Sequence, residues 1–273
     1  MSGGTVLRGI ALTPSGFQRA EVRLEHGRIA DVLDAADAPG GLYILPGLVD
    51  AHIHGAGGSQ EPARMAQFLP TVGVTAFVPT VATSSREDTL AFVAAVAELK
   101  PETGAAEVLG SHLEGPFLSP HHCGAHTRKH LRLPDLAEAR DLLAAARGTL
   151  RRMTLAPELR GAGELIELLA GAGVLVSLGH SACSYEQALR AAARGATSVT
   201  HAYNAMATFH HRAPGLVGAA FTDQRLRSEL IADGVHVHSA AALALIRSRG
   251  SDGVAIVSDG LPALGMQPGE YTW

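Results

Sequence analysis

The sequence is poor in the features that mark several large classes of protein. It has two cysteines, Cys123 and Cys183, among 273 residues, which argues against a disulfide framework and favours a reducing, cytoplasmic compartment. No apolar run reaches roughly 18 residues, and the first residues lack the pattern of a signal peptide. We therefore expect neither a membrane span nor export. The net charge of −4 argues against nucleic acid as a partner.

The sequence does contain enough apolar material for a large core, with 47% hydrophobic residues. That is sufficient for one large domain, alone or with a small companion. Residues 5–33 alternate as β-strands do around a His26-Gly27 turn, which predicts a hairpin or a small antiparallel sheet. Residues 34–41 are rich in Ala, Asp, Pro and Gly and are typical of a linker.

From Leu42 onwards, strand-like and helix-like segments alternate, which predicts an α/β fold. The expected strands are 42–49, 74–78, 107–113, 152–156, 174–178, 197–200, 228–232 and 253–258. The expected helices are 61–70, 86–99, 135–147, 163–171, 184–193 and 239–249. Eight strands with intervening helices favour a (β/α)8 barrel of the TIM type, with a doubly wound open sheet as the alternative.

Three apolar runs end in a polar residue that could bind a metal ion. Glu114, His180 and His201 each stand where an expected strand ends. Because the carboxyl ends of parallel strands meet at one rim, we expect these side chains to converge. One carboxylate and two imidazoles form a ligand set suited to Zn²⁺ or a similar divalent ion. Each residue alone is a weak signal, but together they predict a metal site.

Further polar residues follow other strands. His52 and His54 lie at positions i and i+2, so both face the same side of a strand and are expected to reach the same site. His236 follows the seventh strand and Asp259 follows the eighth. Asp259 is either a turn residue before Gly260 or, beside a metal-activated water, a general base. The loop histidines His121, His122, His210 and His211 are more typical of solvated side chains.

Taken together, these motifs resemble the N-acetylglucosamine-6-phosphate deacetylase family of the amidohydrolase superfamily. Besides His-x-His after the first strand and Asp after the eighth, the matching segments are HLEGPF at 112–117, GAH at 124–126, LAPE at 155–158, GHS at 179–181, THAYNAM at 200–206 and IADGVH at 231–236. The resemblance runs in order from Pro46 to Asp259. It implies a metal-dependent amidohydrolase barrel that releases acetate from a phosphorylated amino sugar.

The resemblance assigns a role to each matching position. It implies that Glu114, His180 and His201 bind the principal ion, that His52 and His54 support a second ion, and that Asp259 is the catalytic acid/base. We expect His236 to help hold the oxyanion. Zn²⁺ is the expected metal, one or two per chain, with Fe²⁺, Mn²⁺ or Co²⁺ as alternatives. The expected substrate-binding residues are Ala125, His126, Asn204, Ala205, Arg212, Asp233, Gly234, Val235 and His236.

Two expectations concern the substrate phosphate and the extent of the chain. Arg212 matches the family's phosphate anchor, although its position alone suggests a solvated loop arginine. Family members continue well beyond the residue equivalent to Asp259, so we expect a truncated chain. Residues 1–45 would be part of a small β-sandwich, and residues 46–273 a barrel without its last helix. For a full-length protein we expect a homodimer.

Three other functions stay open. One is a hydrolase of the same superfamily that acts on another N-acetyl amino sugar phosphate or on a cyclic amide. A second is a non-catalytic fragment that keeps its metal ligands. A purely structural barrel is the third, and it is disfavoured because the chain supplies every expected ligand.

Overall fold

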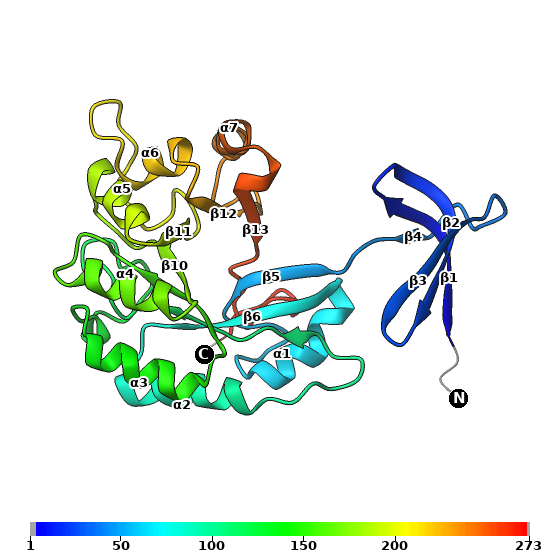
Figure 1. Cartoon of the computed structure of the whole chain (residues 1–273), viewed down its shortest axis with the longest axis horizontal. Coiled ribbons are helices and arrows are strands. Elements are labelled where there is room, and N and C mark those ends of the chain that lie inside the picture. Colours follow the sequence, from blue (N-terminus) through cyan, green and yellow to red (C-terminus); the bar gives the residue numbers. More distant parts are fainter. Residues whose placement is uncertain (1–3, 272–273) are drawn as a thin grey trace. The chain divides into compact units, whose positions relative to one another are not determined.

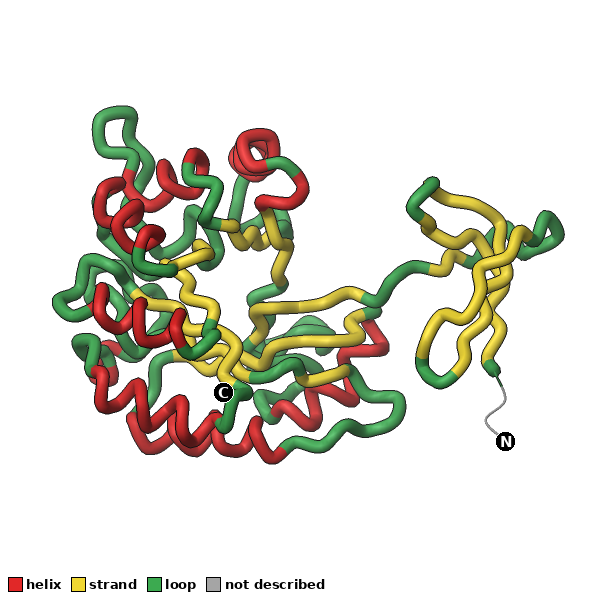
Figure 2. Tube along the Cα trace, in the orientation of Figure 1, coloured by secondary structure: helices red, strands yellow, loops and turns green. Residues whose placement is uncertain are grey.

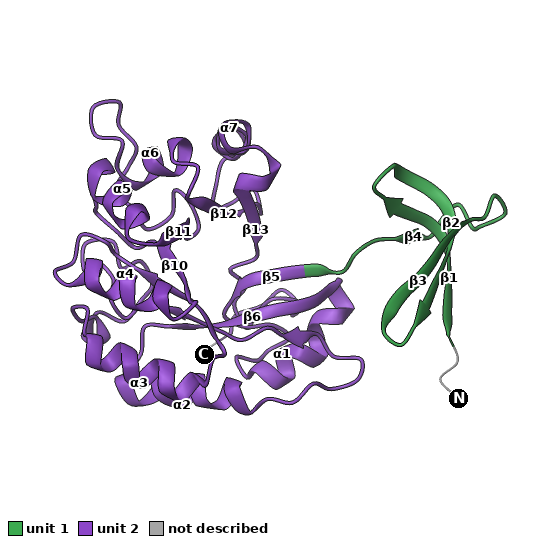
Figure 3. Ribbon diagram, in the orientation of Figure 1, with its two compact units in different colours: residues 1–48 green, residues 49–273 purple. Residues whose placement is uncertain are grey.

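The computed structural model describes residues 4–271, which divide between two compact units, residues 1–48 and 49–273 (Figure 3). The sequence placed this boundary between residues 45 and 46. In the first unit, a four-stranded sheet has the order β3-β2-β1-β4. Its strands are β1 (Thr5–Thr13), β2 (Gly16–Glu25), β3 (Arg28–Asp34) and β4 (Tyr43–Ile44).

The predicted turn at His26 and Gly27 joins β2 to β3. Both residues have positive φ, 51° and 75°, as a two-residue hairpin turn requires. Strands β1, β2 and β3 pair antiparallel, whereas β4 runs parallel to β1. The buried apolar cluster of this unit is small, consisting of Ala11, Ala20 and Val22.

The second unit is a near-closed barrel of eight parallel strands, so the (β/α)8 prediction is confirmed and the open-sheet alternative is wrong (Figure 1). Its order is β5-β6-β8-β9-β10-β11-β12-β13. The main chain closes it at the carboxyl ends, where Ile53 and Gly260 form a parallel bridge. The strands are β5 (Leu48–Ile53), β6 (Val74–Ala82), β8 (Ser111–Glu114), β9 (Leu150–Leu155), β10 (Leu175–Leu178), β11 (Ala196–Val199), β12 (Arg227–Ile231) and β13 (Val254–Val257).

Helices lie around the outside of these strands (Figure 2). Ser85, Asp135 and Ser184 cap three of them by accepting backbone N–H groups. The helices are α1 (Pro62–Phe68), α2 (Arg86–Glu98), α3 (Leu136–Ala146), α4 (Ala162–Gly171), α5 (Tyr185–Ala193), α6 (Gly215–Thr222) and α7 (Ser239–Arg249). The sequence did not predict α6, because Pro214, Gly215 and Gly218 disguise a short, mostly buried helix. Short 3₁₀ turns span Leu69–Val72, Arg128–His130 and Ser251–Gly253.

Two expected strands are interrupted. The run 42–49 divides at Pro46-Gly47 into β4 of the small sheet and β5 of the barrel, so His52 lies within the first barrel strand rather than after it. The run 107–113 divides at Gly110 into β7 (Glu107–Val108) and β8. Gly110 has φ of 135°, and a Cβ atom there would lie 2.2 Å from the carbonyl oxygen of Thr149.

Apolar and polar residues occupy different parts of the barrel unit. Between strands and helices lies the main core, which includes Leu142, Met153, Leu165 and Leu178. Inside the barrel, many buried side chains are polar, such as those of His112, Thr154 and Ser177, and they lie beneath the carboxyl ends of the strands. Over the stretch 4–271, no helix combines the length and the apolar character needed to span a bilayer.

Candidate metal centre and substrate cavity

Glu114 is the point on which the site converges. It is the last residue of β8, and its side chain is 3% exposed. Its Oε1 atom lies 2.9 Å from Nε2 of His201 and 3.0 Å from Nε2 of His180, and those two nitrogens are 3.0 Å apart. His180 and His201 stand just after β10 and β11. The structure therefore brings the three predicted principal ligands to one point.

A second set of ligand atoms lies beside the first. Nε2 of His52 and Nε2 of His54 are 3.3 Å apart, and each is 3.3 Å from Oδ1 of Asp259. Oε2 of Glu114 is 3.1 Å from Nε2 of His54. His52, His54 and Asp259 thus form a group that could hold a metal ion. Glu114, of the first group, reaches this second group through its Oε2 atom.

Hydrogen bonds on the far side of the imidazole rings direct lone pairs into this centre. Nδ1 of His180 lies 3.0 Å from the carbonyl oxygen of His122, so it donates its proton there and leaves the Nε2 lone pair facing His201. Nδ1 of His52 lies 3.1 Å from Oε2 of Glu229 and donates in the same way. Facing lone pairs about 3 Å apart repel each other unless a cation lies between them. The donor set therefore fits one or two divalent cations with His and carboxylate ligands.

Backbone conformation at the rim is strained at several site residues. His180, His201 and Asp259 all have positive φ, at 47°, 28° and 49°, a region that non-glycine residues seldom adopt. Asp259 is held there because its N–H donates to the carbonyl oxygen of His52, at 2.9 Å. Such strain often accompanies a functional constraint. Here it turns the side chain of each residue from the strand end towards the centre.

The electrostatics of the cluster favour ionised carboxylates and a neutral imidazole. Burial alone would raise the pKa of the Glu114 carboxyl, but the surrounding imidazoles of His52, His126, His180 and His201 hold that pKa well below its ordinary value. The pKa of Asp259 is also lowered, since His54 and His52 outweigh its burial. Burial lowers the pKa of His180. A carboxylate and an unprotonated imidazole are the forms that bind metal.

His126 also reaches the centre, with Nε2 3.2 Å from Oε2 of Glu114. Its other nitrogen, Nδ1, accepts the backbone N–H of Thr83 at 3.0 Å. Neutral His126 therefore carries its proton on Nε2 and donates to Glu114, which leaves it no lone pair for a metal ion. This tautomer suits a hydrogen-bond donor at the edge of the cavity rather than a metal ligand.

A cavity of about 710 Å³ opens over the metal centre, a volume typical of sites for small molecules. Five of the predicted substrate-binding residues line it, namely Ala125, His126, Asn204, Ala205 and His236. Gln60, Leu261 and Leu264 line it as well, and none of these three was predicted from the sequence.

The other predicted substrate residues lie outside this lining. Arg212 is exposed in the loop before α6, where its backbone N–H donates to Nδ1 of His210. Asp233, Gly234 and Val235 precede His236 in an exposed loop. Asp233 accepts the backbone N–H of His236 and lies 2.7 Å from Nδ1 of its ring, and those hydrogen bonds lower the pKa of Asp233 to about 2.

A buried polar network beneath the centre was not predicted. His112 bonds to Thr154 at 2.8 Å, and Thr154 bonds to Thr200 at 2.8 Å. Arg152 and Glu229 form an ion pair nearby. The sequence did contain a sign of this network, because polar residues interrupt otherwise apolar strands. His112, for example, stands two positions before Glu114 and so faces the same side of β8. Burial lowers the pKa of His112 well below its ordinary value, so it is a neutral hydrogen-bonding group.

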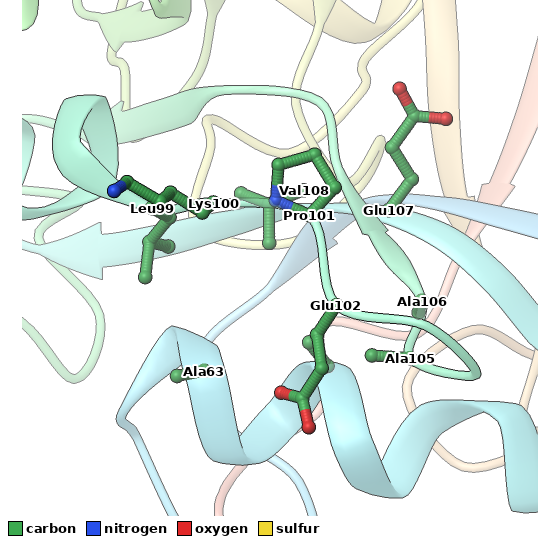
Figure 4. Close-up of a pocket in the computed structure, with 10 residues that line it drawn as sticks. Ala63, Leu99, Lys100, Pro101, Glu102, Ala105, Ala106, Glu107 and Val108 are labelled. Carbon is green, nitrogen blue, oxygen red and sulfur yellow. The ribbon is translucent and has the colours of Figure 1, made fainter.

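A separate cavity of about 310 Å³ lies between α1 and the segment 99–108 (Figure 4). Its lining is mainly small and apolar, with Ala63, Ala105 and Val108 around it and the carboxylates of Glu102 and Glu107 projecting from the same segment. These residues do not form a ligand set, and we assign no function to this cavity.

Comparisons with known proteins agree with this geometry. The amidohydrolase family matches residues 43–266. The chain is 38% identical over 241 residues to an N-acetylglucosamine-6-phosphate deacetylase of Vibrio furnissii, covering 85% of this chain and 60% of that protein. It is also 38% identical over 237 residues to an N-acetylgalactosamine-6-phosphate deacetylase of Escherichia coli O157:H7, covering 84% and 63%. The chain thus spans somewhat under two thirds of these curated relatives.

Solved structures give the same result. The crystal structure of N-acetyl-D-glucosamine-6-phosphate deacetylase from Mycobacterium smegmatis matches with a TM-score of 0.87 and 33% identity, covering 98% of this chain and 74% of that one. A mutant of that enzyme in complex with N-acetyl-D-glucosamine-6-phosphate matches with a TM-score of 0.88 and 32% identity, covering 99% and 74%. By its sequence match, its barrel and its histidine-rich rim, the chain belongs to the amidohydrolase family.

Proposed function

We propose that this chain carries the active centre of a metal-dependent deacetylase, which hydrolyses N-acetyl-D-glucosamine 6-phosphate to D-glucosamine 6-phosphate and acetate in amino-sugar catabolism. The observation that carries the proposal is the convergence of Glu114, His180 and His201 with Asp259 at the floor of a sugar-sized cavity. The deacetylase relatives support the same reaction. Zn²⁺ suits the ligand set best, with Fe²⁺, Mn²⁺ or Co²⁺ as alternatives.

The proposed mechanism divides the work among few residues. Glu114, His180 and His201 would hold the principal ion, and His52 and His54 would support a second. When bound, the ion supplies a water of lowered pKa and a polarised carbonyl. Asp259 takes the water proton as the water oxygen attacks the acetamide carbon, and then returns that proton to the departing amine. The low pKa of Asp259 keeps it ionised and ready to accept.

The remaining groups bind the substrate. His236, whose Nδ1 atom lies 2.7 Å from Oδ2 of Asp233, would help to hold the negative charge on the carbonyl oxygen. Ala125, His126, Asn204 and Ala205 would contact the sugar along the wall of the cavity. Arg212, together with the loop from Asp233 to Val235, would bind the phosphate side, as a guanidinium can do with two parallel hydrogen bonds. The homodimer and the cytoplasmic location stay predictions.

A second candidate substrate is N-acetyl-D-galactosamine 6-phosphate, which is favoured by the 38% identity to the Escherichia coli deacetylase named for it. The two sugars differ only in the configuration at one hydroxyl-bearing carbon. Selection between them therefore depends on hydrogen-bonding groups of the cavity wall rather than on the metal centre.

The test is release of acetate by the zinc-loaded chain. Both 6-phosphates and unphosphorylated N-acetylglucosamine would be supplied separately, with chelator-treated protein as the control. We expect acetate from N-acetylglucosamine 6-phosphate, less from its galactose epimer, and almost none after chelation. Metal-loaded protein that releases no acetate from any of them would refute the proposed function of this chain.

A further inference from the structure

Glu229 lies inside the barrel on β12, with 1% of its surface exposed, and has no part in the proposed mechanism. One of its oxygens, Oε2, is 3.1 Å from Nδ1 of His52 and 3.1 Å from the backbone nitrogen of His201. A single carboxylate oxygen thus accepts from one residue of each ligand group. Its own backbone carbonyl also accepts the N–H of Ala202 at 2.8 Å, which ties β12 to the residue after His201.

Arg152, on β9, holds Glu229 from the other side. Its Nη1 atom pairs with Oε1 of Glu229. Its Nη2 atom donates to Oγ of Ser177 at 2.9 Å and to Oγ of Ser198 at 2.7 Å. The guanidinium is therefore anchored to β10 and β11, and it is 6% exposed. This arrangement leaves Glu229 little freedom to turn away from His52 and His201.

We propose that Glu229, held by Arg152, is a positioning residue for the metal centre and controls the second cation position. By accepting from Nδ1–H of His52, it leaves the lone pair of that ring on Nε2, which faces His54 and Asp259. By accepting the N–H of His201, it holds that residue at its strained φ of 28°. This inference uses the metal centre of the proposed function and adds groups that touch neither metal nor substrate.

An ion pair of a buried carboxylate that only stabilises the fold would not affect metal binding. The chain offers an example for comparison, with a partly exposed arginine as the partner. Glu138, on α3, is also buried at 3% exposure and bonds to Arg132 through two nitrogens at 2.5 and 3.1 Å. That pair lies outside the barrel. Removing either carboxylate should destabilise the protein, since breaking a buried pair strands a charge. Only the loss of Glu229 should alter metal binding.

Glu229→Gln removes one acceptor while keeping the shape. If the amide oxygen faces His52, the NH₂ group points at Arg152, where two donors meet. If the oxygen faces Arg152, the NH₂ group forces Nδ1 of His52 to accept, and the ring proton moves to Nε2. Either arrangement weakens His52 as a ligand. Arg152→Lys is a gentler second variant, because it keeps a positive charge beside Glu229 and loses only the anchoring fork.

The experiment measures zinc binding by the folded chain in competition with a chelator of known affinity. We expect wild-type protein to bind two equivalents. In Glu229→Gln the second equivalent should bind about 10–100-fold more weakly, and in Arg152→Lys it should weaken in the same direction. Glu138→Gln should bind both as wild-type does, although its melting temperature falls. Wild-type affinity for both equivalents in the two barrel variants would overturn the proposal, as would a wild-type chain with a single zinc position.

Zinc binding does not depend on turnover, so this test and that of the proposed function can fail separately. A chain that binds two equivalents and releases no acetate would refute the deacetylase and leave the role of Glu229 standing. If instead the chain releases acetate and the Glu229→Gln variant has unchanged zinc-binding isotherms, the role of Glu229 is refuted and the deacetylase function stands.

Discussion

The strand ends beneath the cavity and the two exposed loops, those of Arg212 and of Asp233 to His236, are built differently. On the strand side, Glu114 is within 3.2 Å of four histidines, and each of those residues is fixed by the main chain of a strand end or the loop next to it. On the loop side, Arg212, Asp233 and His236 are exposed and bond within their own loops. Metal binding and proton transfer, which need groups placed to a fraction of an ångström, are thus assigned to the rigid strand side, whereas the loop side supplies His236 and the contacts to substrate.

The difference has a physical origin. A side chain at the end of a parallel strand inherits its direction from the sheet, and the barrel brings eight such ends together. A loop residue has no such constraint, and its position is completed by whatever it binds. We therefore expect substitutions on the strand side to change kcat and metal binding, and those on the loop side to change KM.

The largest effect is expected at Asp259, on the strand side. Asp259→Asn keeps the turn geometry, since Asn tolerates the same positive φ, but it removes the proton acceptor. We expect kcat for N-acetylglucosamine 6-phosphate to fall by at least about 10²-fold, which is the usual contribution of general acid–base catalysis. KM should change little, because the substrate-binding loops are untouched. Steady-state kinetics of zinc-loaded protein measure both constants.

Metal content is the control for that experiment, since Asp259 also lies beside His52 and His54. The variant should retain the principal equivalent of zinc on Glu114, His180 and His201. Full kcat with metal bound would remove Asp259 from the mechanism and make His236 the next candidate. It would also show that a group fixed at a strand end does no chemistry here.

Arg212, on the loop side, should give a smaller effect of a different kind. Arg212→Ala is expected to raise KM for the 6-phosphate sugar roughly 10–100-fold, the cost of a charge-assisted hydrogen-bond pair. KM for the unphosphorylated sugar should not change. Arg247→Ala, at an exposed position on α7, is the matched control for loss of one surface charge.

An equal rise in KM for both sugars would mean that Arg212 supports the loop and does not bind phosphate. If the phosphate is bound across a homodimer, the same substitution would act on the neighbouring site. Mixed dimers of one Arg212→Ala protomer and one inactive Asp259→Asn protomer would then show whether Arg212 acts on the active site of its own chain or on that of its partner.

The same difference between strand ends and loops decides how much of the site could be predicted from the sequence. Periodicity and the polar residues at strand ends predicted the eight-stranded barrel and the residues that gather at its rim, because strand geometry converts sequence position directly into direction. The strand expected over 42–49 was placed too early, since an apolar run does not show which sheet a Pro-Gly break will divide it between. Helix α6 was missed because its glycines and its fully apolar face carry no helical periodicity.

The partners of each site residue could not be predicted in the same way. Glu229 and His52 are 177 positions apart, and their hydrogen bond depends on strand register across the barrel. Thr83, in the loop just after β6, likewise fixes the tautomer of His126 from 43 positions away along the chain. For Arg212, only the family resemblance suggested a role, and the structure places it in an exposed loop outside the cavity lining.

The smallest effect is expected at Asp233, which supports His236 on the loop side. Asp233→Asn can still accept the backbone N–H groups of Val235 and His236, and it loses only the negative charge beside the imidazole ring of His236. Because this pair is exposed, the loss should lower kcat/KM by no more than about fivefold.

The pH dependence of that effect follows from the pKa of Asp233, which is lowered to about 2 by its bonds to His236. A carboxylate whose pKa is lowered in the folded protein contributes fully to stability at a pH above its pKa in the unfolded chain, near 3.8. This contribution is lost only as the pH falls through the folded-state pKa of about 2. Over the pH range of an ordinary assay, Asp233 is therefore ionised throughout, and its own titration should add no inflection to the wild-type profile. A loss of about 10²-fold, as large as that expected for Asp259→Asn, would show that this exposed loop is as finely positioned as the strand ends.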